Sequence, residues 1–153
     1  MDTEIILNHE KYCELWKEIS KLYEEYAKTF GLSYTNLQVL NSIYAAKDGC
    51  TQKQVIEQTL LPKQTVNAAV TGFWKQGYVE LTELPEDRRV KTIRLTETGK
   101  QYADGIVPKI ENAGAKAMEM LTPEQRSALI ETTCLMRDAL QKSMKESKAD
   151  LHE

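Results

Sequence analysis

The stretch LPEDRRVKTIRLTETG, residues 84–99, decides how this chain folds. It places four cations within seven positions, in a chain of 23 acidic and 20 basic residues: Arg88, Arg89, Lys91 and Arg94. Apolar residues alternate with polar ones at Val79 and Leu81, just before the stretch, and again at Ile93 and Leu95, in its second half. This period of two predicts two strands around a polar turn, which is a hairpin with arginines at its tip.

Four helices are expected before this hairpin, because apolar residues recur there at steps of three and four. The first runs from an N-cap at Asn8 to Phe30, and the second carries Leu37, Leu40, Ile43 and Tyr44 and ends near Asp48 and Gly49. The third opens with a capping box of Thr51 and Gln54 and has Val55, Ile56 and Leu60 as its core residues. The fourth lies between Pro62 and Gly77, with Val66, Ala69, Val70 and Phe73 facing inward.

Two more helices are expected after the hairpin. Thr96 caps a long helix that extends to Ala117 and is kinked at Pro108, and Thr122 with Gln125 caps the last helix, which continues through Met144. Two short helices followed by a hairpin have the size of a winged helix-turn-helix. The predicted fold is therefore mainly α with a small β-hairpin wing, in one domain over residues 1–153.

Composition excludes several classes of protein. The 153 residues, 41% of them hydrophobic, can form one folded domain. We expect a cytoplasmic protein, because the sequence shows neither a signal peptide nor a membrane span. The three cysteines have no CxxC spacing, which argues against a zinc site or disulfide framework. The formal charge is −3 overall but +1 over residues 31–99, so positive charge collects in the middle of the chain.

The outward face of the fourth helix suits DNA recognition. Glutamine and asparagine pair with adenine, while lysine reaches guanine or a phosphate. The residues assigned to DNA contact are Lys63, Gln64, Thr65, Asn67 and Thr71 on this helix, Lys53 on the helix before it, and Asp87, Arg88 and Arg89 in the hairpin. Asp87 is placed to orient Arg89 toward a minor groove. The alternative is that both the helix face and the hairpin are simply solvated.

The same stretch resembles the wing of the multiple-antibiotic-resistance regulator (MarR) family. The similarity consists of an Asp-x-Arg followed by Leu-Thr and Gly, at Asp87, Arg89, Leu95, Thr96 and Gly99, and of the preceding FWKQGYV, residues 73–79. The resemblance implies a homodimeric winged-helix repressor that binds a pseudo-palindromic operator on double-stranded DNA. Residues 33–99 would form the DNA-binding lobe, while residues 1–32 and 100–153 would form the dimerisation helices. Ala68 departs from the family, because many members have a basic residue there.

The resemblance further implies release of DNA by a small aromatic or phenolic ligand, with Trp16, Tyr23 and Tyr34 lining its cleft. Aromatic residues at helical spacing are more often core residues. Some relatives sense peroxide through a cysteine in the first helix. Cys13 lies about one turn too late for that role, so an inert, half-buried thiol is the favoured interpretation.

Enzyme activity finds no support, because the sequence lacks a nucleophile elbow, a phosphate-binding loop and a HExxH zinc motif. We expect no cofactor and no metal. Two alternatives to the ligand-controlled repressor stay open: a winged-helix adaptor that binds protein instead of an operator, and a redox-sensing regulator that uses Cys13.

Overall fold

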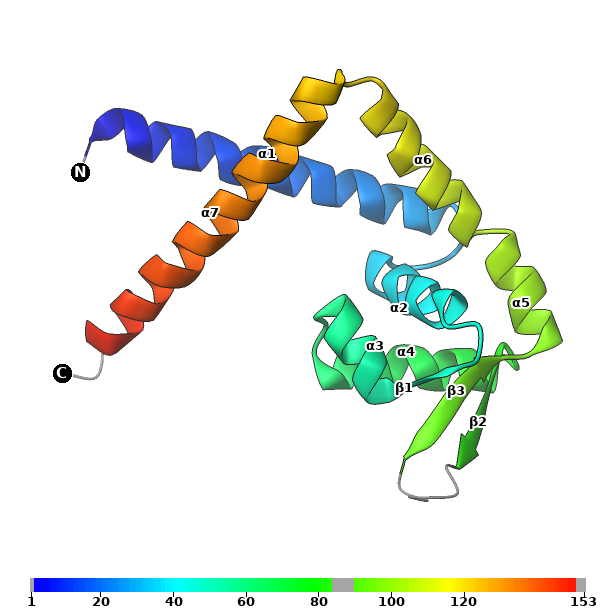
Figure 1. Ribbon diagram of the computed structural model, residues 1–153. Helices are drawn as coiled ribbons and strands as arrows, with labels where there is room; N and C mark the ends of the chain where they lie inside the picture. The colour runs from blue at the N-terminus through cyan, green and yellow to red at the C-terminus, as the bar shows by residue number, and fades with distance from the viewer. Residues whose placement is uncertain (1, 84–89, 151–153) are drawn as a thin grey trace. The chain divides into compact units, whose positions relative to one another are not determined.

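The computed structural model describes residues 2–83 and 90–150, with side-chain burial up to residue 148. The chain divides into two compact units, residues 1–110 and 111–153. The first unit contains α1 (Thr3–Lys28), α2 (Tyr34–Ala45), β1 (Cys50–Thr51), α3 (Gln52–Thr59), α4 (Lys63–Lys75), β2 (Val79–Glu83), β3 (Lys91–Leu95), α5 (Glu97–Asp104) and the start of α6 (Val107–Glu119) (Figure 1). The second unit contains the rest of α6 and α7 (Pro123–Asp150).

The chain forms a small antiparallel sheet with the strand order β1-β3-β2, in which β1 precedes the helix-turn-helix of α3 and α4 and the other two strands follow it. Strands β2 and β3 form the predicted hairpin, in which Leu81 pairs with Ile93 and Val79 with Leu95. The sequence did not predict β1, which has only two residues and pairs Cys50 with Ile93. A strand this short has no recognisable period, but it joins the hairpin to the start of α3.

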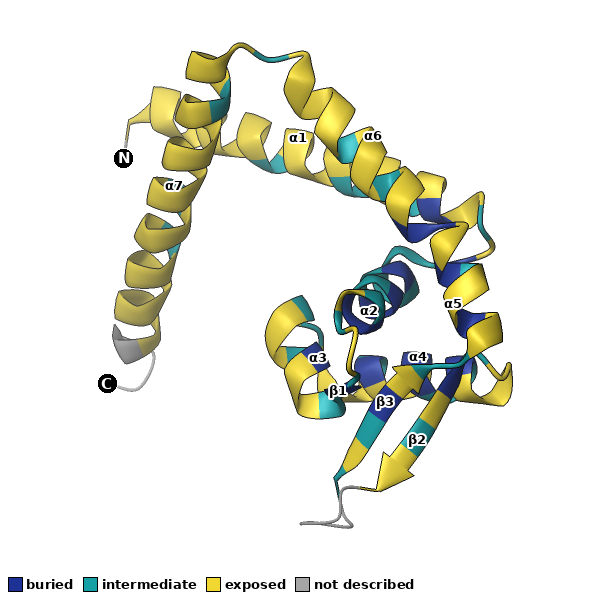
Figure 2. Cartoon of the chain, turned by 45° about the vertical axis from the view of Figure 1, so that its right-hand side comes forward, coloured by how far each residue is buried: buried dark blue, intermediate teal, exposed yellow. Residues whose placement is uncertain are grey.

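The core of the first unit confirms the predicted inward faces. Val66, Ala69, Val70 and Phe73 of α4 are all buried, and so are Leu37, Leu40 and Ile43 of α2 and Val55 of α3. Figure 2 shows these buried positions concentrated on α2, α4 and the sheet, while α1 is exposed along most of its length. The mainly helical winged-helix class is therefore confirmed.

The helix caps follow the predicted chemistry. Thr51 and Gln54 form a full capping box at the start of α3. The hydroxyl oxygen of Thr96 accepts from the N–H of Gly99 at 3.0 Å, and Thr122 and Gln125 cap each other reciprocally at the start of α7. Each cap satisfies backbone N–H groups that have no partner inside the helix.

Three local predictions were wrong. Helix α1 begins at Thr3 with Asp2 as its N-cap, so Asn8 lies inside the helix. Leu60 is 86% exposed, because it ends α3 with a left-handed φ of 57° and thus leaves the core-facing side of the helix. The helix expected to kink at Pro108 is instead two helices, since α5 ends at Asp104 and α6 begins at Val107. Proline has no N–H to donate to the previous turn, which accounts for the break.

Thr96 and Gly99 fasten the hairpin to α5. The Thr96 N–H donates to the Tyr78 carbonyl at 3.0 Å, and its hydroxyl donates to the Gly77 carbonyl at 2.6 Å. The rings of Tyr78 and Tyr102 stack with centroids 4.2 Å apart. Leu95, Thr96 and Gly99 therefore form a structural joint at the base of the hairpin.

Candidate nucleic-acid interface

Helix α4 presents a polar face beside the hairpin. Its buried positions lie on one side, while Lys63, Gln64, Asn67 and Ala68 are exposed and Thr65 and Thr71 are half-buried. Pro62 occupies the N-cap and Gly77 has a φ of 73°, so both ends of the helix agree with the sequence to within about a residue. A helix of 13 residues with short polar side chains on its open side has the form of a major-groove reading helix.

A cavity of about 350 Å³ lies between α4, the start of α3 and the hairpin. It brings together three of the predicted residues, Lys53, Asn67 and Thr71, and adds Lys91 of β3. Its floor is apolar, with Val70, Leu81 and Ile93. Lys53 also lies 3.7 Å from a carboxylate oxygen of Glu57, but both side chains are largely exposed, so this ion pair is weak. The groove therefore offers two cations, Lys53 and Lys91, together with hydrogen-bonding side chains that include those of Asn67 and Thr71.

Gln52 and Lys91 belong to this groove but were not among the predicted site residues. The Gln52 Nε2 is buried and has no hydrogen-bond partner in the described part of the chain. A buried amide donor without an acceptor is uncommon, and a ligand oxygen would satisfy it. Lys91 lies in the basic run of residues 88–94, so the sequence offered a signal that it could contact DNA. No feature of the sequence distinguished Gln52 from other glutamines.

The remaining predicted contacts are not gathered in this groove. Lys63 and Gln64 are exposed in the first turn of α4, outside the cavity lining. Asp87, Arg88 and Arg89 lie outside the described residues. Their role at the tip of the hairpin thus stays a prediction.

Arg94 lies on the opposite face of the sheet from Lys91, although both belong to the same basic run. In the hairpin register Lys91 and Ile93 pair with Glu83 and Leu81, whereas Arg94 pairs with Glu80 on the opposite face of the sheet. Its Nε donates to the Asp48 carbonyl at 3.0 Å. One arginine of the basic run therefore holds β3 against the turn between α2 and β1 instead of facing the α4 groove.

Two of the three aromatic residues assigned to a ligand cleft meet at the junction of α1 and α2. The rings of Tyr23 and Tyr34 stack with centroids 5.0 Å apart, and burial together with Tyr23 raises the pKa of Tyr34. Trp16 is 63% exposed and lies earlier in α1 than Tyr23 does. The cavities beside α4, at the base of the hairpin and along α1 are lined by other residues than these three.

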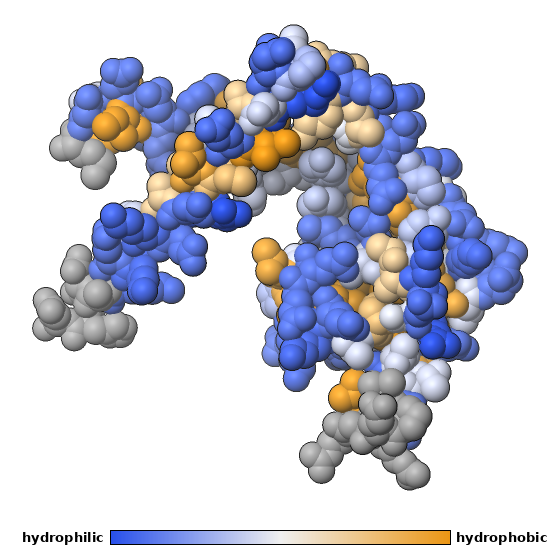
Figure 3. All heavy atoms as spheres, in the orientation of Figure 1, coloured by the Kyte–Doolittle hydropathy of each residue, from blue (hydrophilic) through white to orange (hydrophobic). Residues whose placement is uncertain are grey.

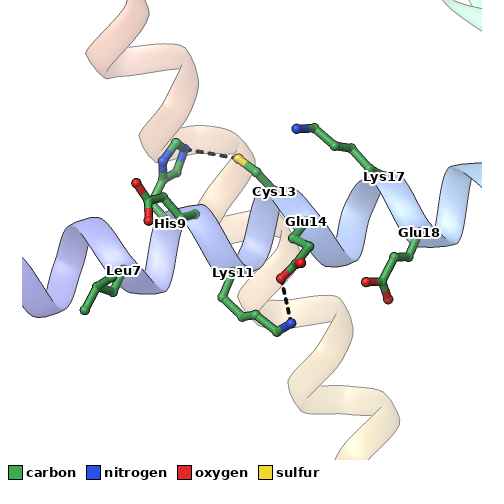
Figure 4. A pocket seen from close by; sticks show the side chains of 8 residues that line it. Leu7, His9, Lys11, Cys13, Glu14, Lys17 and Glu18 are labelled. Carbon is green, nitrogen blue, oxygen red and sulfur yellow. Dashed lines mark hydrogen bonds and ion pairs between the residues drawn. The ribbon is translucent and has the colours of Figure 1, made fainter.

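Cys13 is half-buried on α1, within a hollow whose lining residues all belong to that helix (Figure 4). Its Sγ lies 3.5 Å from Nε2 of His9, one turn earlier, and Lys11 forms an ion pair with Glu14 at 2.7 Å. The thiol thus contacts a histidine rather than the stacked tyrosines.

Cys50 and Cys134 are likewise free thiols, and burial raises the pKa of Cys50.

Apolar side chains lie open on the long helices (Figure 3). The exposed ones on α1 are Ile5, Ile6, Leu7, Tyr12, Leu15, Trp16, Ile19, Leu22, Tyr23 and Tyr26, and those on α7 are Leu129, Ile130, Leu135 and Met144. Many exposed apolar side chains on one helix mark it as a candidate interaction surface.

Two kinds of site are missing from the residues that the structure describes. No three His, Cys, Asp or Glu side chains are grouped so that they could hold a metal ion. None of the described helices has the length and hydropathy needed to cross a membrane.

Residues 30–90 match the sequence model of the MarR family. The HTH-type transcriptional regulator PrsX of Escherichia coli is 32% identical over 84 residues, which cover 54% of this chain and 51% of PrsX. The HTH-type transcriptional regulator SarZ of Staphylococcus epidermidis is 36% identical over 84 residues, covering 55% of this chain and 56% of SarZ. The chain thus spans about half the length of the relatives that it matches.

Solved structures with the same fold match over most of the chain. NMB1585, a MarR family regulator from Neisseria meningitidis, has a TM-score of 0.77 at 25% identity over 90% of this chain and 96% of that one. Sco3205 is a MarR family transcriptional regulator from Streptomyces coelicolor that was solved in complex with DNA. It has a TM-score of 0.79 at 20% identity, over 92% of this chain and 90% of Sco3205. The second likeness shows the fold alone.

Proposed function

We propose that the chain is a MarR-family regulator of transcription, a homodimer that binds a pseudo-palindromic operator and represses the genes beside it. The observation that carries the proposal is the polar face of α4, exposed beside a hairpin and lining a groove with Lys53, Asn67, Thr71 and Lys91. Two relatives are named HTH-type transcriptional regulators, and a structural neighbour was solved with DNA, which supports this reading.

In the proposed complex each α4 enters a major groove. Two-fold symmetry then sets the half-sites about one helical turn apart, roughly 10 base pairs from centre to centre. Asn67 is exposed in the middle of α4, where a side-chain amide reaches a base edge. Lys53 and Lys91 supply contacts to phosphates, and Arg89 is assigned to the adjacent minor groove.

The test is DNA binding to the region upstream of the protein's own coding sequence, measured by mobility shift and by fluorescence anisotropy at several salt concentrations. Asn67→Ala should cost roughly 1 to 3 kcal/mol and relax specificity at one position in each half-site. Arg89→Ala should weaken all operators similarly and reduce the slope of log affinity against log salt by about one unit.

Lys145→Ala removes a cation that is exposed in the last part of α7 and is not assigned to DNA contact, so it should leave both quantities unchanged. If Arg89→Ala also leaves affinity and slope unchanged, the hairpin is only a solvated turn. If the wild-type protein binds no duplex, the adaptor function becomes the better hypothesis.

We further propose that a small aromatic or phenolic compound releases the DNA. The stacked Tyr23 and Tyr34 support this, because they join the last part of α1 to the start of α2, where the lobe meets its preceding helix. A ligand shifts affinity only if it binds the two conformations differently. Salicylate and related phenols should raise the melting temperature and weaken operator binding. Ligand control is abandoned if a broad panel changes neither.

A further inference from the structure

A second cavity of about 540 Å³ lies at the base of the hairpin, within the first unit. Its wall is formed by the last turn of α2, the following turn, the outer face of the sheet and the first turns of α5. The cavity is separate from the α4 groove, because Glu80 and Arg94 line it, whereas Leu81 and Ile93 of the other sheet face line the groove. Its volume falls within the range of sites for small molecules.

The lining is unbalanced in charge. Lys47, Arg94 and Lys100 contribute three cations, and Glu80 contributes the one carboxylate. None of the three cations forms an ion pair within 4.0 Å with a described residue. A concave surface with one excess sign of charge attracts a ligand of the opposite sign.

Arg94 is held in place for such a ligand. Its Nε donates to the Asp48 carbonyl, and its side chain lies across Gly49, where a Cβ would approach its Cγ to 2.6 Å. Gly49 has a φ of 89°, so the turn both requires glycine and leaves room for the arginine. The terminal Nη groups of Arg94 make no hydrogen bond to a described residue. A guanidinium fixed through Nε presents its Nη groups for paired bonds to two oxygens of an anion.

The cavity also has an apolar part. Ile43 is buried beneath it, and Ala46 and Leu95 are half-buried in its wall. The carboxylate of Asp104, on the next turn of α5, accepts from the hydroxyl of Tyr44, which also lines the cavity, at 2.7 Å. The lining combines a cationic rim with an apolar floor.

We propose that this cavity binds a small organic carboxylate, with its oxygens on Arg94 and Lys100 and its apolar body on Ile43 and Leu95. The bound anion neutralises the cluster of cations and connects β3 to the turn before β1 and to α5. Binding to the folded chain raises its thermal stability, and above the dissociation constant this gain grows with the logarithm of the ligand concentration. The inference does not depend on DNA binding, because the site lies on the opposite face of the sheet from the α4 groove.

Benzoate is the probe, and benzamide is its neutral match. In an amide NMR titration of the full chain, benzoate should shift the signals of Gly49, Arg94 and Leu95 saturably, while benzamide should not. Lys100→Gln and Arg94→Gln should each weaken benzoate binding about tenfold, the loss expected for one charge-assisted hydrogen bond. Lys91→Gln removes a cation from the same strand on the other sheet face and should bind benzoate as the wild type does.

Arg94→Gln also removes the bond to Asp48, so Lys100→Gln decides the outcome if the hairpin shifts in the arginine variant. The proposal is overturned if benzamide binds as well as benzoate, if the shifted amides lie elsewhere, or if Lys100→Gln retains full affinity. It is also overturned if these amides respond to duplex DNA but not to benzoate, because the cavity is then a phosphate contact of the operator complex.

Discussion

At the scale of single residues, the packing around Gly99 explains why the stretch of residues 84–99 ends in a glycine. A Cβ added at Gly99 would lie 1.8 Å from the Tyr78 carbonyl oxygen, which is backbone and cannot rotate away. Gly99→Ala should therefore destabilise the fold by about 1 to 3 kcal/mol, the usual range for overpacking. Urea unfolding followed by circular dichroism measures this loss.

The matched control for Gly99 is Gly72, which lies inside α4 with nothing within 4 Å of an added Cβ. Gly72→Ala should stabilise the protein by about 0.5 to 1 kcal/mol, because alanine loses less backbone entropy in a helix. Equal effects of the two substitutions would show that the contact with Tyr78 relaxes easily and that the joint is not tightly packed.

Tyr102 should make stability depend on alkaline pH. Burial, and secondly the stacked Tyr78, raise the pKa of the Tyr102 hydroxyl. Because the folded state holds this proton more tightly than the unfolded state, the associated stability is fully present below the unfolded pKa of about 10 and is lost as pH rises above it. Tyr102→Phe should therefore reduce the fall in unfolding free energy between about pH 9 and 11. An unchanged fall would assign it to other groups, such as Tyr34.

At the scale of elements, a carboxylate of α1 fixes the start of α2. Glu24 Oε2 accepts from the Tyr34 N–H at 2.7 Å, a donor in the first turn that has no partner inside its helix. Glu24→Ala should cost about 1 to 2 kcal/mol, as the loss of a helix cap does. Glu25→Ala is the matched control, because its carboxylate only pairs with the exposed Lys21 at 3.6 Å. Thermal unfolding compares the two, and equal losses would remove the special role of Glu24.

Elements with strong local chemistry could be predicted from the sequence. The capping boxes at Thr51 and Thr122 and the buried face of α4 needed only neighbouring residues to specify them. The failures depend on tertiary context. Strand β1 exists because Cys50 meets Ile93 across the sheet, 43 positions later in the sequence. Leu60 is exposed because the link to α4 turns through a left-handed residue, which an apolar pattern does not reveal.

The candidate site could be predicted in the same limited sense. Periodicity placed Asn67 and Thr71 on the open side of α4, where the structure has them. It could not assign Lys91 and Arg94 to opposite sides, because that assignment requires the hairpin register. The position of Gln52 in the lining of the groove was likewise not predictable from the sequence, because it follows from the tertiary structure. A run of cations in sequence is thus divided by the sheet between two different surfaces.

At the scale of the whole molecule, the exposed apolar residues of the long helices predict a binding partner. Leu15, Ile19 and Leu22 of α1 are 45%, 52% and 65% exposed. A monomer would leave this surface in water at a cost of about 25 cal/mol for each Å². A second copy of the chain is the expected partner, because soluble oligomers are most often two-fold symmetric dimers.

Light scattering at micromolar concentration should therefore give twice the chain mass of 17.5 kDa. Leu22→Glu should shift the protein toward the monomer, because it places a charge among the exposed apolar residues of α1. Gln141→Glu adds the same charge at an exposed polar position of α7 and should leave the mass unchanged. A monomeric wild-type protein would remove the two-fold symmetry on which the operator spacing depends. A dimer that Leu22→Glu does not weaken would place the interface elsewhere on the chain.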